Sequence, residues 1–216
     1  MDTLQLAVVE WVCKSSNSQE EGHEENHVSG SVSRQRMREH DDDRGALASC
    51  SAMTPPTISG PQLGRATECE AILRSLPAWF GIEQAIQMYV QDTEKYPTFG
   101  IAQDDKLVGF MTLRQHFPDS WEVHCMAFHA DARNMGLGTK LLTHCENWLA
   151  ERGAKFLQVK TVAATSPCPE YAQTRAFYEH RGFIPLEIFP EMWDAHNPAL
   201  QCIKVLSKTG CCTTDA

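Results

Sequence analysis

The stretch from residue 121 to residue 152 constrains the fold more than any other part of this chain. Residues 121–128 are rich in apolar and strand-forming side chains, and the polar residues 129–135 that follow are typical of a turn. From Leu137 on, apolar side chains recur at helical spacing, at positions 137, 141, 142, 145, 148 and 149. The sequence therefore predicts a strand, a glycine-containing turn and an amphipathic helix.

Gly136 and Gly138 make this turn suitable for binding an anion. The start of a helix offers unpaired backbone N–H groups and positive dipole charge, and a residue without a side chain lets an anion approach closely. A Walker loop does not fit, because it needs Gly-Lys-Ser/Thr and the order here is Gly138-Thr139-Lys140. A dinucleotide fingerprint does not fit either, because its third glycine position holds Leu141.

The remaining pattern, Arg133-x-x-Gly136-x-Gly138, resembles the acetyl-coenzyme A pyrophosphate loop of the GNAT N-acetyltransferase superfamily, which reads Gln/Arg-x-x-Gly-x-Gly/Ala. Alone, this short pattern also fits a turn without a ligand. A second motif favours the family, because residues 176–183 resemble its helix that ends in Phe-Tyr-x-x-x-Gly-Phe before a strand. The resemblance covers roughly residues 63–206, and two motifs in the right order make an unrelated phosphate binder a poor fit.

The order of the other elements is that of a mixed α/β sheet. The sequence predicts helices at residues 67–76 and 83–93, a hairpin of residues 98–102 and 106–114, a strand at 155–162, a helix at 171–181, and strands at 184–189 and 200–206. No strand is predicted before Thr67, and Pro55, Pro56 and Pro61 predict a linker. The resemblance implies the GNAT fold, a mostly antiparallel twisted sheet with splayed middle strands, flanked by about four helices.

The resemblance also implies acetyl-CoA as a co-substrate and a site that holds it. The backbone around the glycine turn would bind the pyrophosphate, and the backbone of the preceding strand would pair with pantetheine like an added strand. The expected donor-binding residues are Met126, Ala127, Phe128, Arg133, Asn134, Met135, Gly136, Leu137, Gly138 and Thr139. The side chains of Met126 and Phe128 are equally compatible with plain core packing.

Glu122 is the predicted general base, because many members of the superfamily place a glutamate near the start of this strand. It would act directly if burial raises its pKa, or through a water. Strict alternation places Glu122, His124 and Met126 on one face, and a bulge would break that pattern. His124 is the rival base. The alternative interpretations are an exposed strand charge for Glu122 and a structural histidine for His124.

Tyr178 is the predicted general acid, because this tyrosine of the superfamily protonates the departing thiolate. The alternative interpretation is an aromatic anchor between helix and sheet. The family often has an asparagine seven residues earlier, where this chain has Tyr171. That departure puts one contact to coenzyme A in doubt.

A loop predicted at residues 189–198 is expected to border the acceptor pocket. Glu191 and Asp194 would attract an ammonium group there, and Trp193 would stack on it. A surface loop with a half-buried tryptophan explains the same residues. Trp79 and Tyr89 fit a pocket wall or the core.

Composition limits the remaining possibilities. The net charge of −9 argues against a nucleic-acid binder. The nine cysteines form no Cys-x-x-Cys pair, and no metal-ligand motif occurs, so we expect free thiols, a cytoplasmic protein and no metal. The sequence contains no apolar run long enough to predict a membrane span, and it predicts no membrane anchor. We expect a disordered tail and linker at residues 1–60, the folded domain at 61–207, and a flexible tail at 208–216.

The sequence thus predicts an acetyl-CoA-dependent N-acetyltransferase that acts on a small primary amine in a ternary complex, as a monomer or homodimer. Amino acids, polyamines and aminoglycosides are the small amines considered. Two alternatives remain, a protein N-terminal or lysine acetyltransferase and a non-catalytic acyl-CoA-binding module.

Overall fold

The computed structural model describes residues 54–166, 168–194 and 196–207. The tail expected at residues 1–60 therefore lies outside the described residues up to residue 53, and the tail expected at 208–216 lies entirely outside them. None of the helices in the described ranges is long and apolar enough to cross a membrane. The oligomeric state and the cellular compartment stay predictions.

The described residues form one seven-stranded sheet, in the order β1-β2-β3-β4-β5-β7-β6. The strands are β1 (Thr57–Gln62), β2 (Thr98–Gln103), β3 (Lys106–Phe117), β4 (Ser120–Phe128), β5 (Phe156–Val162), β6 (Ile184–Asp194) and β7 (Asn197–Val205). All neighbouring pairs are antiparallel except β4 and β5, which run parallel because α3 connects them. The predicted mixed fold with a mostly antiparallel sheet is confirmed.

β4 and β5 separate in the middle of the sheet. Their pairing runs from Ser120↔Phe156 to Val123↔Val159 and then stops. Beyond that point, β4 stays paired to β3 as far as Phe128, and β5 stays paired to β7 as far as Val162. The two middle strands therefore open into a gap toward their carboxyl ends, which is the predicted splay.

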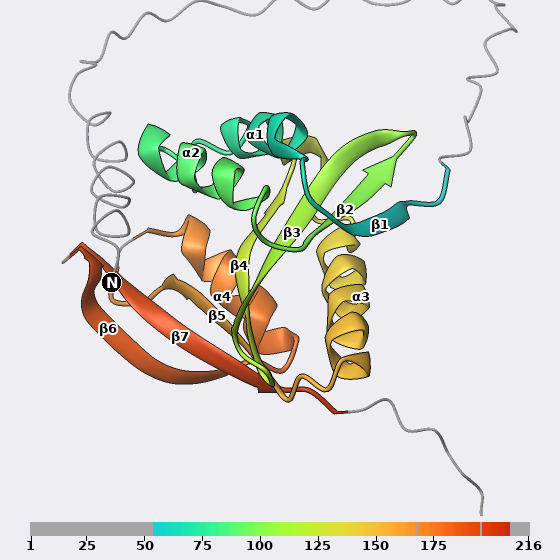
Figure 1. Cartoon of the computed structure of the whole chain (residues 1–216). Helices are drawn as coiled ribbons and strands as arrows, with labels where there is room; N and C mark the ends of the chain where they lie inside the picture. Colours follow the sequence, from blue (N-terminus) through green and yellow to red (C-terminus); the bar gives the residue numbers. More distant parts are fainter. Residues whose placement is uncertain (1–53, 167, 195, 208–216) are drawn as a thin grey trace, which may run out of the picture.

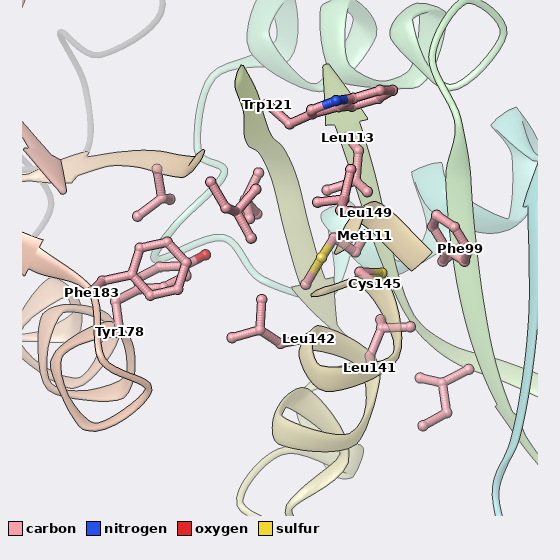
Figure 2. Packing of buried hydrophobic residues seen from close by; sticks show 14 of the residues in the cluster. Phe99, Met111, Leu113, Trp121, Leu141, Leu142, Cys145, Leu149, Tyr178 and Phe183 are labelled. Carbon is pink, nitrogen blue, oxygen red and sulfur yellow. The ribbon is translucent and has the colours of Figure 1, made fainter. Parts of the chain in front are cut away.

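Two core clusters cover the opposite faces of the sheet. On one face, α3 (Leu137–Glu151) packs against β2 and β3, and α4 (Glu170–His180) packs against β5. Their apolar residues join one cluster, in which Phe99, Leu141 and Leu149 are fully buried (Figure 2). On the other face, α1 (Ala66–Arg74) and α2 (Glu83–Asp92) form a second cluster around Phe110. Figure 1 shows α1 and α2 together, apart from α3 and α4.

The hairpin between β2 and β3 and the four helices form where the sequence predicts them, and no end differs by more than three residues. Asp104 and Asp105 both have positive φ angles, 50° and 62°, as a tight two-residue turn requires. The regular apolar spacing of each segment explains this agreement.

Two predictions about the ends of the domain are wrong. β1 lies where a linker was predicted, and it pairs antiparallel with β2 as the edge of the sheet. Pro61 contributed to the linker prediction, but an edge strand tolerates proline. Gly60 is also required there, since a Cβ atom would lie 2.7 Å from the carbonyl oxygen of Thr98.

The loop predicted at residues 189–198 is shorter than expected, because β6 continues to Asp194 and β7 begins at Asn197. Pro190 and Pro198 both lie within these strands, so the two prolines do not end them.

We expect Leu149→Ala to lower the free energy of unfolding by about 2–5 kcal/mol, because it empties a fully buried site in the main core cluster. Urea denaturation measures this change. Leu186→Ala is the control, since Leu186 is 58% exposed and its truncation should cost no more than about 0.5 kcal/mol. An equal decrease in the free energy of unfolding in both variants would contradict the assignment of Leu149 to the core.

Candidate active site

A cavity of about 420 Å³ lies in the gap between β4 and β5. Val123 and Cys125 line it from the β4 side, and Val159 and Lys160 line it from the β5 side. The turn before α3 and the first part of α4 close one side, and the α1–α2 connection closes another. The splay therefore creates a site that both faces of the sheet can reach.

The glycine turn opens directly onto this cavity. Gly136 caps α3 with a left-handed backbone, φ 74°, which a residue with a side chain rarely adopts. Gly138 lies in the first turn of the helix, where a Cβ atom would meet the rings of Phe177 and Phe128 at 3.4–3.5 Å. The first N–H groups of α3 have no acceptor within the helix, so they point positive charge into the cavity.

Nearly all of the predicted donor-binding residues line the cavity. The exception is Met135, which is 45% exposed and is not part of the wall. The residues that do line it are Met126, Ala127, Phe128, Arg133, Asn134, Gly136, Leu137, Gly138 and Thr139. The end of β4 and the start of α3, which are close in the sequence, thus line the same cavity.

Arg133, the predicted extra phosphate partner, already has neighbours. Its guanidinium lies over the ring of Trp79, 4.0 Å from the ring centre, and one of its N–H groups lies 3.5 Å from Oε1 of Gln173. Tyr171 donates a hydrogen bond from its hydroxyl to the carbonyl of Trp79 at 3.2 Å. The α1–α2 connection is therefore tied to both the donor loop and α4.

Thr161 places an unsatisfied hydroxyl in the cavity wall. The residue is 4% exposed, and its Oγ1 has no hydrogen-bond partner among the described residues. A buried polar atom without a partner is destabilising, so such an atom in a cavity wall indicates a place for a ligand or water.

Tyr178 lies where the cavity meets the main core cluster. Its ring packs against that of Phe183, with the ring centres 5.2 Å apart (Figure 2). It also packs against Phe177, whose ring centre is 5.3 Å away. Burial raises the pKa of its hydroxyl above the ordinary value, and nearby Cys125 and Cys202 add to that effect. The hydroxyl therefore keeps its proton at neutral pH. Tyr178 therefore packs as the predicted aromatic anchor of α4 and also lines the cavity. Its role as the general acid stays a prediction.

Glu122 lies beside the cavity without being part of its wall. Its carboxylate accepts a hydrogen bond from Nζ of Lys160 at 2.8 Å and another from Nε2 of His116. Burial opposes ionisation of Glu122, but the His116 hydrogen bond and the Lys160 charge outweigh it and lower its pKa from 4.5 to about 2. A raised pKa was the condition for Glu122 to act directly, and the pKa is lowered instead, because two donors that the sequence does not reveal converge on this carboxylate.

His124 occupies a bulge in β4 and does not line the cavity. The register shifts between Thr112↔Cys125 and Leu113↔Val123, so His124 has no partner on β3. Its Nε2 donates to Asp92 at 2.8 Å, and its side chain is 6% exposed between Tyr89 and Tyr96. The bulge breaks the predicted alternation, because Met126 now faces the α3 cluster while Glu122 and His124 face α1 and α2.

Many of the residues that line the cavity are aromatic. Trp79 and Phe80 line it from the α1–α2 connection, Tyr89 from α2, Tyr171 from α4 and Trp193 from β6. Trp193 therefore lies in the predicted pocket border, whereas Glu191 is exposed and outside the wall. The side chain of Asp194 lies outside the described residues.

Sequence reasoning missed Lys160, Thr161 and His116. A signal existed for Lys160, because a lysine inside the apolar alternation of a central strand is unusual in a globular protein. His116 gave no signal, since only the pairing of β3 with β4 brings it to Glu122.

The described residues hold no group of three histidine, cysteine, aspartate or glutamate side chains suited to a metal ion. The five cysteines within the described ranges, Cys69, Cys125, Cys145, Cys168 and Cys202, are free thiols. The absence of a metal stays a prediction. What the arrangement offers is an anion-binding turn, a neutral tyrosine and an aromatic chamber that meet at the gap in the sheet.

A sequence model described as the acetyltransferase (GNAT) family matches residues 68–183, which is more than half of the chain. The matched segment contains the glycine turn and ends at the phenylalanine of the second motif. No curated protein sequence matches the chain.

Solved structures with this fold include a GNAT-family protein from Desulfovibrio desulfuricans, which is 16% identical over 71% of this chain and 100% of that one, with a TM-score of 0.63. The ribosomal-protein-S18-alanine N-acetyltransferase from Escherichia coli is 23% identical over 72% of this chain and 97% of that one, with a TM-score of 0.59. An aminoglycoside 6'-N-acetyltransferase complexed with coenzyme A is 20% identical over 70% of this chain and 97% of that one, with a TM-score of 0.54. At these identities the likeness shows the fold.

We expect Glu122→Gln to destabilise the protein at pH 7 by on the order of 3 kcal/mol, because it removes an ionised group whose pKa is lowered from 4.5 to about 2. A lowered pKa stabilises the fold above about pH 5, and this contribution is lost as the pH falls toward 2. The difference between wild type and variant should therefore shrink in urea denaturation as the pH is lowered from 7 to 3.

Glu83→Gln is the matched control for that experiment. Glu83 also has a pKa lowered to about 2 by the Arg74 hydrogen bonds, but it is fully exposed, so solvent screens the pair and little stability should depend on it. A Glu122→Gln effect that does not change with pH would mean that its ionisation does not stabilise the fold.

Proposed function

The chain belongs to the GNAT acetyltransferase family, and we propose that it transfers the acetyl group of acetyl-CoA directly to a small primary amine bound in the same cavity. The observation that carries this proposal is the cavity itself, in which the glycine turn, the free edge of β4 and Tyr178 meet at the gap between β4 and β5.

The residues present fit acetyl-CoA. The first N–H groups of α3 and the Arg133 guanidinium suit a pyrophosphate, and Gly138 keeps the space between two phenylalanine rings free. The β4 backbone from Met126 to Phe128 has its side toward β5 unpaired, so an extended pantetheine arm can pair with it like a strand. The partnerless hydroxyl of Thr161 faces the same space.

Acetyl-CoA supplies a thioester that a neutral amine attacks, forming a C–N bond and breaking the C–S bond. A backbone N–H of β4 polarises the acetyl carbonyl. Tyr178 donates its proton to the departing thiolate, and its raised pKa keeps that proton available at neutral pH. Close placement of the two reactants supplies much of the rate enhancement.

We propose that a water in the cavity carries away the proton of the attacking ammonium. Both oxygens of Glu122 already accept hydrogen bonds, from His116 and Lys160, and a carboxylate with a pKa of about 2 is a weak base. Glu122 as the base and His124 as its rival stay predictions.

We expect Gly138→Glu to weaken acetyl-CoA binding by at least roughly tenfold, because it places a carboxylate where the pyrophosphate should lie. Calorimetry with acetyl-CoA measures this loss. Thr143→Glu adds the same charge on the exposed face of α3 and should bind normally. Gly136→Glu should behave like Gly138→Glu, with additional backbone strain. Absence of binding to the folded wild type would overturn the proposal.

We expect Tyr178→Phe to lower kcat by about 100-fold or more and to leave acetyl-CoA affinity nearly unchanged, because only the proton donor is removed. Release of the coenzyme A thiol with an accepted amine measures kcat. Tyr96→Phe is the control, since Tyr96 is outside the cavity wall and its ring packs under Arg114. Donor binding without turnover of any amine would instead favour a non-catalytic acyl-CoA-binding module.

A further inference from the structure

Lys160 lies at the apex of the gap in the sheet. It directly follows Val159, the last residue of β5 that pairs with β4. Its side chain is 17% exposed, lines the cavity, and reaches Glu122 with an Nζ–Oε1 distance of 2.8 Å. An ammonium group has three N–H donors, so the Glu122 contact leaves two of them available.

The side chain of Lys160 extends toward the aromatic half of the cavity. Leu157 and Val159 belong to the core cluster that contains α3 and Tyr178. Successive side chains of a strand point to opposite faces, so Lys160 faces α1 and α2, as Glu122 does. The glycine turn lies at the start of α3 on the other face. Lys160 therefore belongs to the acceptor half of the cavity rather than to the donor half.

The charged residues that line the cavity limit which acceptor molecules it can bind. Among the described side chains that line the cavity, the charged ones are Arg133 and Lys160, and none is a carboxylate. Arg133 lies on the donor loop, over Trp79. The carboxylates close behind the wall, Glu122 and Asp92, already accept hydrogen bonds from basic side chains. A polycationic acceptor would find no free counterion here and would meet a lysine.

Aromatic side chains from the α1–α2 side and from β6 line the cavity that Lys160 enters. Trp79 and Phe80 line the cavity from the α1–α2 connection, Tyr89 lines it from α2, and Trp193 lines it from β6. Such walls bind an apolar or aromatic side chain, since they offer area and few hydrogen bonds. One lysine among aromatic rings is a site for a molecule with one negative charge and an apolar body.

Building on the proposed acetyl transfer, we propose that the acceptor is a small amine with a carboxylate next to its amino group and an apolar or aromatic side chain, and that Lys160 binds the carboxylate. The two remaining N–H donors of Lys160 satisfy this carboxylate. Because Lys160 lies at the apex of the gap, a carboxylate bound there directs the adjacent amino group toward Cys125 and Tyr178. The acetyl transfer itself is unchanged.

The first test uses the wild-type protein and pairs of acceptors that differ in charge alone. Phenylalanine, tryptophan and leucine are each compared with their α-carboxamides, with spermidine, phenethylamine and a peptide with a free N-terminus as further acceptors. We expect kcat/KM to be about ten- to a hundredfold higher for each acid than for its amide, the range typical of a hydrogen bond to a charged group. The amino group of an amide loses its proton more readily, so amine basicity cannot produce this preference.

The outcomes separate the two proposals. Preferred turnover of the amides, spermidine, phenethylamine or the peptide would overturn the acceptor assignment and leave the acetyltransferase function standing. Acetyl-CoA binding without turnover of any amine would overturn both. Preferred turnover of the acids supports both.

The second test asks whether Lys160 is the residue that binds the carboxylate of the acceptor. In Lys160→Gln the ratio of kcat/KM for acid over amide should fall to near one, and in Lys160→Arg most of the ratio should remain. Lys155→Gln is the matched control, because Lys155 is 68% exposed and pairs with Asp119 on the surface. Thermal unfolding and acetyl-CoA calorimetry check that each variant folds and binds the donor. A ratio that survives in a folded Lys160→Gln protein would overturn the role of Lys160.

Discussion

The end of pairing between β4 and β5 is the constraint on which the rest of this structure depends. Up to Val123↔Val159 the two parallel strands satisfy each other, and beyond it the backbone of β4 has a free edge in the middle of a sheet. Free N–H and C=O groups in a protein interior are destabilising unless water or a ligand pairs with them. The gap is thus both the cavity and a row of hydrogen-bonding groups for an extended ligand.

Keeping such a gap open requires support from both faces. The α3 and α4 cluster holds one side of each strand, and Tyr178 packs across the gap between β4 and the β5–β7 side. The α1 and α2 cluster holds the opposite face, with Phe110 at its centre. The bulge at His124, fixed by Asp92, turns β4 at the point where pairing ends. Each of these contacts joins residues far apart in the sequence.

Electrostatics divide the cavity into two halves of different character. The half that we propose for the donor has the positive start of α3 and Arg133, which suit phosphates. The half that we propose for the acceptor has Lys160 held by Glu122, in a cavity with many aromatic lining residues. Glu122 stays ionised although it is buried, because His116 and Lys160 both donate to it. This buried carboxylate holds the side chains of His116 and Lys160 in place.

The sequence by itself determined the order of the elements, the glycine turn and the family. These depend on apolar spacing within a segment and on residue types at fixed short distances, such as Gly136 and Gly138 before the α3 face. It did not determine β1. The prolines of this segment are typical of a linker, and only the pairing with β2 shows that it is a strand. Nor did it determine the partners of Glu122, because His116 comes from β3 and Lys160 from β5. Those contacts, and the charge of the acceptor half with them, were decided by the tertiary structure, since only strand register places three distant side chains together.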